Sequence, residues 1–403
     1  MTPFRTLDSL PDAQRVLLRL DLNSPVESGK VQDNRRFTRH SQTVAELASK
    51  DHQVIILAHQ GRPGNRDCIS LAQHADILES YLNHEVAFID DTYGARVTDA
   101  IEKLEPGQIL LLENTRMLDD ELPEEDPTVK ANTEFVQSLS AIVDCYVNDA
   151  YSTAHRSHAS LVGFARTLPA YGGRVMQAEY DANTAIAGKE FDGQVTMVLG
   201  GTKAGDIIEM MEYLGETVDT FLLGGIAGEL FLRASGAPVG YDIQTETDQC
   251  DTQWKENHAS IKTVLAEYGG QIELPTDLAY EITGNRKEQA VAGIDKKETF
   301  YLDIGTETAM RYADVIRDST AVFVKGALGV FEDERFAVGT VTILEAIADT
   351  DCFSVVGGGD TSRAVGIYNL DADSFDHISI AGGAYLRALT GEPLVGVEVL
   401  KSG

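Results

Sequence analysis

The segment VVGGGDTSRA (355–364) passes from a short apolar run through three consecutive glycines into a helix-like pattern. Two earlier segments, VLGGTKAGD (198–206) and LLGGIAG (222–228), repeat this order of strand, glycine and helix. In an open α/β sheet, ligands bind beyond the carboxyl ends of the strands. Glycine there lets the backbone approach a ligand and leaves the next helix N-terminus free to meet an anion. The three turns therefore predict an α/β domain with a phosphate site at one sheet edge.

These turns are not the standard phosphate or dinucleotide fingerprints. GxxxxGK[ST] does not occur, and no turn is a clean GxGxxG. One glycine turn alone is a weak signal, because glycine often just ends a strand, but three in one domain favour a nucleotide phosphate site. In GGGDTS, backbone N–H groups could meet phosphate oxygens and Asp360 is available for Mg²⁺. Lys203 could reach the transferring phosphate as a point charge.

Apolar runs on both sides of these turns predict the strands of a parallel sheet. They are QVTMVLGG (194–201), TFLLGG (220–225), QIELPTD (271–277), TAVFVKG (320–326), CFSVVGGG (352–359) and HISIAGG (377–383). The segment 241–268 is acidic, polar and helix-like, and we interpret it as a solvated face.

The first half of the chain has the same alternation of strand and helix. Its predicted strands are RVLLRLDL (15–22), QVIILAH (53–59), EVAFID (85–90), GQILLLEN (107–114) and AIVDCYVND (141–149), with helices at 35–51 and 71–83. Such alternation is typical of a parallel sheet covered by helices on both faces. The fold class is therefore α/β, with two doubly wound, Rossmann-like domains joined by a hinge helix. The expected boundaries are 1–170 for the first domain, 171–190 for the helix and 191–387 for the second domain.

The chain is strongly acidic. It has 403 residues, and 33 Lys and Arg against 64 Asp and Glu give a formal net charge of −31. This charge excludes a general nucleic-acid-binding surface and disfavours anionic membranes. Such a surface repels itself unless salt screens it, so we interpret it as an adaptation to high intracellular salt; a merely acidic mesophilic protein is the alternative.

No targeting or membrane segment is apparent. No apolar run approaches the length of a membrane span, and the N-terminus lacks a basic region followed by an apolar one. The four cysteines lie far apart and show no metal-ligand spacing. These features predict a cytoplasmic protein with reduced thiols.

Basic residues of the first half recur at strand ends and helix starts. They are Arg19, Arg36, His59, Arg62, Arg116, His155, Arg156 and His158. Each arginine alone is more simply explained as a surface or ion-pair residue, but five at equivalent positions predict one electropositive pocket for carboxylate or phosphate oxygens. Asp149 and His155 are compatible either with acid–base chemistry or with a structural hydrogen-bonded pair.

A series of motifs across nearly the whole chain resembles the phosphoglycerate kinase family, of the archaeal type. The motifs are RVLLRLDLNSP, DNRRF, AHQGRP, LLENTR, VNDAYSTAHRSHAS, VLGGTKAGD, LLGGIAG, ELPTDLA, LDIGTETA, GALGVFEDERFAVGT, SVVGGGDTS and HISIAGGAYLRALTGE. Each motif is modest alone, but the ordered set is specific.

The resemblance implies a role for individual residues. The first domain would bind 3-phosphoglycerate or 1,3-bisphosphoglycerate through Asp21, Asn23, Arg36, His59, Arg62, Arg116 and Arg156, with Arg19 in a structural part nearby. The second would bind the Mg–nucleotide through Gly200, Gly201, Lys203, Gly224, Gly305, Glu332 (at the ribose), Gly357, Gly358, Gly359, Asp360 (also at the metal) and Thr361. Arg36, Lys203, Gly359 and Gly383 would serve catalysis. Residues 388–403 would pack back on the first domain.

The sequence also departs from the family pattern. Bacterial and eukaryotic members have a second lysine four positions after Lys203, where this chain has Ile207. Lys325-Gly326-Ala327 replaces the usual Asn-Gly-Pro, so Lys325 is a candidate to supply the missing phosphate contact. Tyr385 stands where a small residue is usual, which puts the shape of the last glycine loop in question.

The implied reaction is the reversible transfer of a phosphoryl group between 1,3-bisphosphoglycerate with ADP and 3-phosphoglycerate with ATP, a step of glycolysis and gluconeogenesis. The nucleophile is an ionised carboxylate, so no general base is needed, and domain closure with charge stabilisation would suffice. The expected partners are these small molecules and Mg²⁺, in a monomer or alternatively a dimer. A dinucleotide-dependent dehydrogenase and a non-catalytic scaffold of the same fold are the competing interpretations.

Overall fold

The structure is a computed structural model that describes the chain except residues 1, 189–190, 240–248, 295–299 and 402–403. Its contacts divide the chain into two units. The first comprises Met1–Asp181 with Glu392–Gly403, and the second comprises Ala182–Gly391. The boundary falls within α6 (Arg174–Gly188), so the chain passes from one unit to the other inside a helix.

The first unit is built on a six-stranded sheet in which all strand pairs are parallel. The spatial order is β5-β6-β4-β1-β7-β8. The strands are β1 (Arg15–Arg19), β4 (Gln53–Leu57), β5 (Val86–Phe88), β6 (Ile109–Leu111), β7 (Cys145–Asn148) and β8 (Ala170–Gly172). The central strands are buried along nearly their whole length, as their continuous apolar sequence predicted. A two-stranded ribbon, β2 (Val26–Glu27) with β3 (Lys30–Val31), lies outside this sheet.

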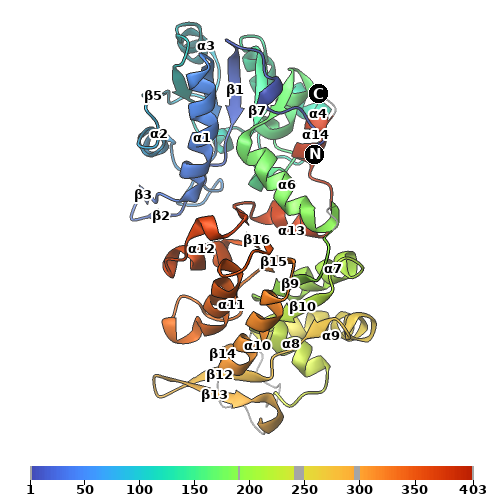
Figure 1. Cartoon of the computed structure of the whole chain (residues 1–403). Helices are drawn as coiled ribbons and strands as arrows, with labels where there is room; N and C mark the ends of the chain where they lie inside the picture. The colour runs from blue at the N-terminus through green and yellow to red at the C-terminus, as the bar shows by residue number, and fades with distance from the viewer. Residues whose placement is uncertain (1, 189–190, 240–248, 295–299, 402–403) are drawn as a thin grey trace. The chain divides into compact units, whose positions relative to one another are not determined.

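Helices pack against this sheet through apolar faces. Asn34 caps α1 by accepting a hydrogen bond from the backbone of Arg36, and Phe37, Val44 and Leu47 of that helix are buried in the core. The α-helices of the unit are α1 (Arg35–Ser49), α2 (Ala72–Glu79), α3 (Ala95–Glu102), α4 (Pro127–Ala131), α5 (Glu134–Ser140) and α14 (Val395–Lys401). Figure 1 shows α14, drawn in red, among the blue and green elements of this unit.

The last helix, α14, is integrated into the first unit although it follows the whole of the second. Val397 and Leu400 are each 1% exposed, and the backbone N–H of Gly396 donates to the carbonyl of Ala154 at 2.7 Å. A Cβ on Gly396 would lie 3.0 Å from Cα of Ala154. The helix therefore packs closely on the loop that follows β7.

The second unit has a six-stranded parallel sheet in the order β11-β10-β9-β15-β16-β17. The strands are β9 (Val195–Leu199), β10 (Thr220–Leu223), β11 (Ile272–Glu273), β15 (Ala321–Lys325), β16 (Phe353–Gly357) and β17 (His377–Ile378). Its helices are α7 (Ala204–Leu214), α8 (Gly225–Ala234), α9 (Gln249–Tyr268), α10 (Thr306–Arg317), α11 (Val338–Ala348), α12 (Gly359–Ile367) and α13 (Gly383–Leu389). The prediction of two α/β parallel-sheet folds is confirmed.

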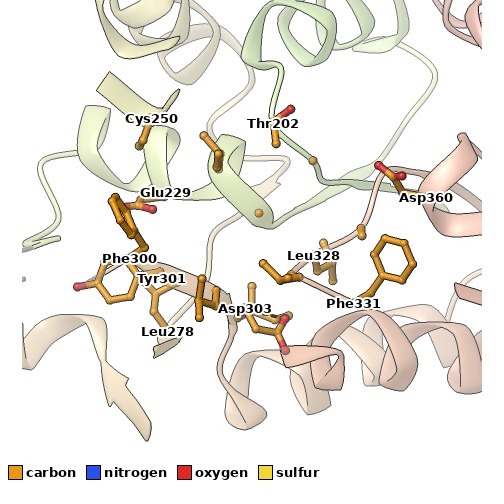
Figure 2. Close-up of a pocket in the computed structure, with 18 of the residues that line it drawn as sticks. Thr202, Glu229, Cys250, Leu278, Phe300, Tyr301, Asp303, Leu328, Phe331 and Asp360 are labelled. Carbon is orange, nitrogen blue, oxygen red and sulfur yellow. Dashed lines mark hydrogen bonds between the residues drawn. The ribbon is translucent and has the colours of Figure 1, made fainter. Parts of the chain in front are cut away.

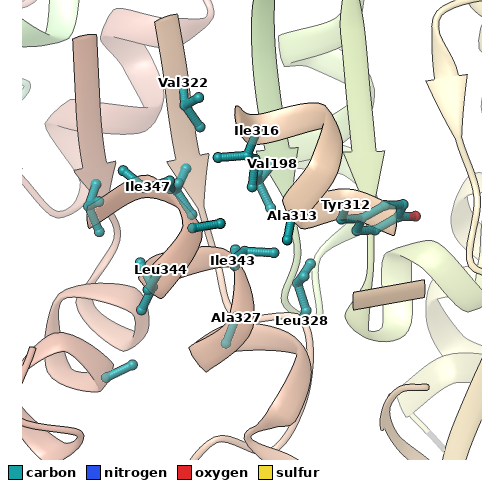
Figure 3. Close-up of a cluster of buried hydrophobic side chains, with 14 of the residues drawn as sticks. Val198, Tyr312, Ala313, Ile316, Val322, Ala327, Leu328, Ile343, Leu344 and Ile347 are labelled. Atoms are coloured by element: carbon teal, nitrogen blue, oxygen red, sulfur yellow. The ribbon is translucent and has the colours of Figure 1, made fainter. Parts of the chain in front are cut away.

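Two helices, α10 and α11, cover one face of this second sheet. Figure 3 shows Ile316, Ile343 and Ile347 from these helices packed beside Val198 and Val322 of the strands. All five side chains are fully buried. Burial stabilises a domain by about 25 cal/mol per Å² of apolar surface removed from water, so this layer stabilises the part of the sheet in which β9 and β15 are paired.

A three-stranded antiparallel sheet in the second unit was not predicted. Its order is β13-β12-β14, formed by β12 (Asp277–Ile282), β13 (Asn285–Ala290) and β14 (Tyr301–Ile304). The expected strand at 271–277 is reduced to β11, and β12 begins at its last residue. The 3-10 and π turns of the chain are Leu7–Ser9, Thr115–Met117, Tyr151–Thr153, Ala159–Gly163, Phe164–Arg166, Val291–Gly293, Glu334–Phe336 and Ala372–Ser374.

Candidate functional site

The first candidate site lies at the carboxyl edge of the first sheet, where Arg19 ends β1. Arg19 is 1% exposed, and its guanidinium is held on three sides. Nε donates to Oγ of Ser160 at 2.8 Å, Nη1 donates to the carbonyl of Leu20, and Nη2 lies 3.0 Å from Nδ1 of His59. Arg19 is therefore part of the frame of the site, as the sequence suggested, rather than a group free to reach a ligand.

Arg36 and Asp21 form the central ion pair of this site. Nε of Arg36 lies 3.2 Å from Oδ2 of Asp21, and Nη1 of Arg36 donates to the carbonyl of Asn23 at 2.6 Å. The Arg36 side chain is 27% exposed and that of Asp21 only 3%. Burial alone would raise the pKa of Asp21, but the charge of Arg36 and the hydroxyl of Ser152 hold it well below its usual range. Asp21 is thus a fixed negative charge that orients Arg36.

His59 is neutral in this environment. Burial lowers its pKa well below the usual value, and the nearby arginines lower it further, against the opposite effect of Asp21. Its Nε2 lies 3.8 Å from Oδ1 of Asp21. A neutral imidazole between Arg19 and Asp21 orders the two charged groups without adding a charge of its own.

Asn23 and Arg116 hold the loop that follows β4. Oδ1 of Asn23 accepts a hydrogen bond from the backbone N–H of Gly61 at 2.8 Å, and Nη1 of Arg116 donates to the carbonyl of Gly61. Burial lowers the pKa of Arg116, and the charges of Arg19 and Arg62 lower it further. An open pocket of about 470 Å³ adjoins Arg116 between the loop segments 63–68 and 116–122.

The remaining predicted residues of this site differ in exposure. Arg62 is exposed, and Arg156 is about half-exposed, with Nη1 3.4 Å from Oε1 of Glu124. The structure thus brings together six of these residues through hydrogen bonds and close charge contacts: Arg19, Asp21, Asn23, Arg36, His59 and Arg116. The side chains of Arg62 and Arg156 are more exposed.

Asp149 has a structural arrangement. Its Oδ2 lies 2.9 Å from Nδ1 of His40, and both side chains are fully buried. Its Oδ1 accepts hydrogen bonds from the backbone N–H groups of Val175 and Met176 at 2.8 and 3.1 Å. Asp149 therefore caps the start of α6, and its histidine partner is His40 rather than the His155 considered in the sequence analysis.

Sequence reasoning missed the buried carboxylate of Glu121. It is fully buried, accepts hydrogen bonds from the backbone N–H and the hydroxyl of Ser160 at 2.7 and 2.6 Å, and so connects to Arg19 through that serine. A buried charge requires such partners. In the sequence Glu121 belongs to an acidic loop, DDELPEED, so no local pattern separates it from solvated neighbours.

The second candidate site lies at the carboxyl edge of the second sheet and is built mainly from backbone. Gly201, Gly326 and Gly358 follow β9, β15 and β16, and their φ angles are +91°, +87° and +90°. A Cβ on Gly326 would lie 2.4 Å from the carbonyl oxygen of Gly200. Side chains cannot occupy these positions without strain. The N–H groups of Gly200 and Gly201 donate to the carbonyls of Lys325 and Ala327 at 2.9 and 2.8 Å, so hydrogen bonds join the ends of β9 and β15.

Polar side chains surround this backbone. Thr361 is fully buried, and its Oγ1 has no hydrogen-bond partner in the part of the chain that the structure describes. The Asp360 carboxylate, in the first turn of α12, is 66% exposed. Lys203 precedes α7 and is exposed. An unsatisfied buried hydroxyl beside an accessible carboxylate fits a site that awaits a polar ligand.

A second cation enters this site from β15. Nζ of Lys325 lies 3.2 Å from Oδ2 of Asp206, which belongs to the first turn of α7, and the two side chains are 17% and 24% exposed. Ile207, at the position where bacterial and eukaryotic members of the family have a lysine, is fully buried.

A pocket of about 430 Å³ extends from this backbone edge into the second unit (Figure 2). Gly201, Glu332 and Asp360 are predicted residues that line it. Thr202 and Asp360 lie at one end, and Glu229, Cys250, Phe300 and Tyr301 lie at the other. The other residues predicted for the nucleotide do not line this pocket: Gly200, Lys203, Gly224, Gly305, Gly357, Gly358, Gly359 and Thr361.

The far end of the pocket was missed from the sequence. Cys250 lies within the segment 241–268 that the sequence analysis interprets as a solvated face, yet it is 3% exposed and lines the pocket. Residues 241–248 of that segment lie outside the described part. Tyr301 is the first residue of β14 in the antiparallel sheet that the sequence did not predict, and Phe300 immediately precedes it. No periodic pattern in the sequence connects these residues to the glycine turns.

Asp303 supports the pocket wall from β14. Oδ2 accepts hydrogen bonds from Arg286 Nη1 at 2.9 Å and from the backbone N–H of Gly339 at 3.0 Å. Burial raises the pKa of Asp303 to about 6, although these contacts oppose the shift. The side chain is part of the wall rather than a free acid.

Two predicted glycines have a packing role. A Cβ on Gly305 would lie 2.0 Å from Oδ2 of Asp277, and one on Gly357 would lie 2.0 Å from the Tyr385 ring. Tyr385 is 1% exposed, and its hydroxyl donates to the carbonyl of Val324 at 3.3 Å. The tyrosine thus fills the space beneath the glycine turn. Gly383 begins α13, after Gly382 with φ of +54°.

No group of three or more His, Cys, Asp or Glu residues suited to a metal ion occurs among the described residues. Asp360 alone offers an accessible carboxylate at the glycine turn. This donor set fits an ion that arrives with a phosphate ligand, because Mg²⁺ is usually bound by one or two carboxylates, phosphates and water.

No helix among the described residues is long and apolar enough to cross a membrane. A family model described as phosphoglycerate kinase matches residues 8–392. The chain is 65% identical over 398 residues to the phosphoglycerate kinase of Haloarcula marismortui, with 99% of each chain covered. It is 64% identical over 403 residues to that of Halorubrum lacusprofundi, covering 100% of this chain and 99% of the relative.

Solved structures give the same result. The crystal structure of phosphoglycerate kinase from Pyrococcus horikoshii matches with a TM-score of 0.89 and 31% identity over 98% of both chains. These matches support neither a dehydrogenase nor a non-catalytic scaffold. The predicted resemblance is therefore confirmed: this chain belongs to the phosphoglycerate kinase family.

Proposed function

We propose that this chain transfers a phosphoryl group reversibly between 1,3-bisphosphoglycerate with ADP and 3-phosphoglycerate with ATP, as a phosphotransferase with a carboxyl group as acceptor. The observation that carries the proposal is the Arg36–Asp21–His59–Arg19 network, which concentrates cations at one sheet edge of a chain with net charge −31. Membership of the phosphoglycerate kinase family supports the same reaction.

In this proposal the first unit binds the phosphoglycerate. Asp21, Asn23, Arg36, His59, Arg62, Arg116 and Arg156 form its site. Arg36 is partly exposed and fixed by Asp21, so its guanidinium can present the N–H groups that Asp21 and Asn23 leave available to an anion. Arg62 and Arg156 are exposed enough to turn toward the substrate phosphate.

The second unit binds the nucleotide. Its phosphates lie against the backbone of the turns at Gly200–Gly201, Gly224 and Gly357–Gly359, with Thr361 Oγ1 as a donor that has no partner in the described structure. Glu332 lines the pocket and accepts the ribose hydroxyls, and Gly305 shapes the neighbouring loop. Mg²⁺ enters as part of the nucleotide substrate, with Asp360 as the protein ligand.

Catalysis follows from position and charge. The attacking carboxylate of 3-phosphoglycerate is already ionised, so no side chain has to remove a proton. Arg36 and Lys203 stabilise the equatorial oxygens of the phosphoryl group, and the helix N-termini that begin at Gly359 and Gly383 add N–H donors. Because donor and acceptor bind to different units, turnover includes the domain closure predicted above.

The proposal also covers the setting of the enzyme. We propose that the enzyme is active in the cytoplasm at high salt. The acidic composition and the similarity to proteins of Haloarcula and Halorubrum support this proposal. We propose a monomer that binds small molecules only.

A coupled assay with 3-phosphoglycerate and Mg–ATP in molar KCl tests the reaction. ADP formation that depends on 3-phosphoglycerate is the expected result. ADP formation that is independent of 3-phosphoglycerate, or absent in protein that binds both substrates calorimetrically, would contradict the proposal.

A further inference from the structure

We propose that Lys325 is a second phosphate-binding cation of the nucleotide site, held in place by Asp206 when no nucleotide is bound. The inference rests on the proposed function only in that the second unit binds a nucleotide. It assigns to this chain a phosphate contact from a strand at the centre of the second sheet, rather than from α7.

The position of Lys325 in the sheet is the first argument. It is the last residue of β15, which lies between β9 and β16, and its register partners are Leu199 and Gly357. The next residue of each of these three strand ends is a glycine: Gly200, Gly326 and Gly358. Lys325 therefore stands in the middle of the backbone edge that would receive the phosphates.

Burial and charge are the second argument. The Lys325 side chain is only 17% exposed, which is unusual for lysine, and its single described ion pair is with Asp206. A lysine ammonium has three N–H donors. One hydrogen bond to Asp206, at 3.2 Å, leaves two donors for phosphate oxygens without breaking the pair.

The polar surroundings of the glycine edge are the third argument. A Cβ placed on Gly358 would lie 3.6 Å from the backbone nitrogen of Gly326 and 3.9 Å from Oγ1 of Thr361. That hydroxyl is fully buried and has no hydrogen-bond partner in the described part of the chain. The unsatisfied hydroxyl of Thr361 and the backbone of Gly326, the residue after Lys325, thus both lie close to Gly358.

The supply of cations by α7 is the fourth argument. Lys203 is exposed just before the helix, and one turn later Ile207 is fully buried in the core. The acidic side chain of Asp206 lies between them in sequence and would repel a phosphate if it were unpaired. Lys325 neutralises this carboxylate and supplies the positive charge that the helix lacks.

The test is calorimetric titration of Lys325→Met with Mg–ADP, Mg–ATP and adenosine in KCl of fixed molarity. The loss of a charge-assisted phosphate contact should weaken both nucleotides by about 10- to 100-fold. Adenosine carries no phosphate, so its affinity should stay within about twofold. Lys287→Met removes an equally charged but exposed lysine on β13 and should change none of the three.

A second background separates phosphate binding from simple neutralisation of Asp206. In Asp206→Asn protein, the added change Lys325→Met should still lower ADP affinity by about 10-fold or more. If the double variant and the single Asp206→Asn variant bind ADP with the same affinity, Lys325 serves only as a counter-ion and the proposal is overturned. Equal weakening of adenosine and ADP would overturn it too, because that pattern means damage to the pocket.

The outcome is separable from that of the proposed reaction. Wild-type protein that binds ADP but transfers no phosphoryl group to or from phosphoglycerate would refute the function. The comparison of ADP with adenosine in the lysine variants would still report on Lys325.

Discussion

The two candidate sites would bind anions by different physical means within one acidic chain. In the first unit, side chains form the site, and its two inner cations are anchored: Arg36 by Asp21, and Arg19 through Ser160 to the buried Glu121. In the second unit, the site is mainly backbone, and glycines stand at positions where the positive φ would strain any residue with a side chain. A strongly negative protein can thus concentrate a few oriented cations, or rely on N–H dipoles that carry no net charge.

The comparison predicts the largest effect at Arg36. Arg36→Ala should lower kcat by about 10³-fold or more while both substrates still bind within about tenfold, because the guanidinium acts mainly on the phosphoryl group in transfer. Steady-state kinetics together with calorimetry of each substrate would measure this. The control is Arg96→Ala, which removes an exposed arginine paired with Asp90 and should leave turnover unchanged. Near-normal kcat with weak phosphoglycerate binding would assign Arg36 to ground-state binding instead.

The second prediction concerns acid sensitivity, which should be concentrated in the first unit. Burial lowers the pKa of His74 to about 4 and that of His158 to about 3. A histidine with a lowered folded pKa stabilises the protein above its unfolded value of about 6.5, and this contribution is lost as pH falls from there toward 4. For His74 the loss approaches about 2–3 kcal/mol, since protonation would place a charge on Nδ1, which is buried without a hydrogen-bond partner.

The second unit should respond to acid in the opposite direction at Asp303. Its raised pKa of about 6 means that the folded state binds the proton more tightly than the unfolded chain does. Asp303 therefore increases the stability of the folded protein as pH falls from about 6 toward 4.

Urea unfolding between pH 7 and 4 tests the prediction for His74. The free energy of unfolding should fall less steeply with decreasing pH in His74→Gln than in wild type, whereas His258→Gln, which changes an exposed histidine, should follow wild type. Identical slopes in all three proteins would contradict the assignment.

The third prediction separates the ligands of the two units. Asp360→Asn should weaken Mg–ADP binding by about tenfold, as expected for loss of one carboxylate contact to the ion, and leave 3-phosphoglycerate affinity intact. Calorimetry with each ligand alone measures both quantities. Glu345→Gln on α11 removes a charge of the same sign from an exposed position and serves as the control. A parallel loss of both affinities would show that the ligands do not bind to separate units.

The smallest expected effect is a difference in salt response. The melting temperature should rise between about 0.1 and 3 M KCl, because the Debye length falls from about 10 Å toward 3 Å and repulsion among the 64 acids is screened. The same ions screen the arginines, so KM for 3-phosphoglycerate should rise several-fold. KM for the nucleotide should rise less, since backbone N–H groups carry much of that site. A flat or falling melting temperature would show that the acidic surface is not a halophilic adaptation.

The predictable and unpredictable parts of the molecule differ in the range of their interactions. Strands such as β1, β4 and β15 were predicted because each carries its signal in a continuous apolar run. The strand β13 was not, because NRKEQA is polar on both faces and pairs only through its neighbour β12. Local sequence reports burial well, but it does not report an edge strand that is largely solvated.

The sites show the same division. Glycine turns and strand-end arginines were visible because their position relative to a strand is a local property. The contact between Asp206 and Lys325 joins residues 119 positions apart, and that between Ser160 and Glu121 joins residues 39 apart. Such pairings depend on the assembled sheets. The sequence therefore identifies candidate ligand-binding residues more readily than it identifies the residues that orient them.

The packing of α14 on the loop after β7 has a consequence for the order of synthesis. A ribosome produces the first sheet early, yet the backbone contact between Gly396 and Ala154 waits until the intervening unit has been translated. During that interval the first unit has a surface that still lacks its final helix. The unit that begins translation first is thus the last to be completed, and its maturation should coincide with release of the chain.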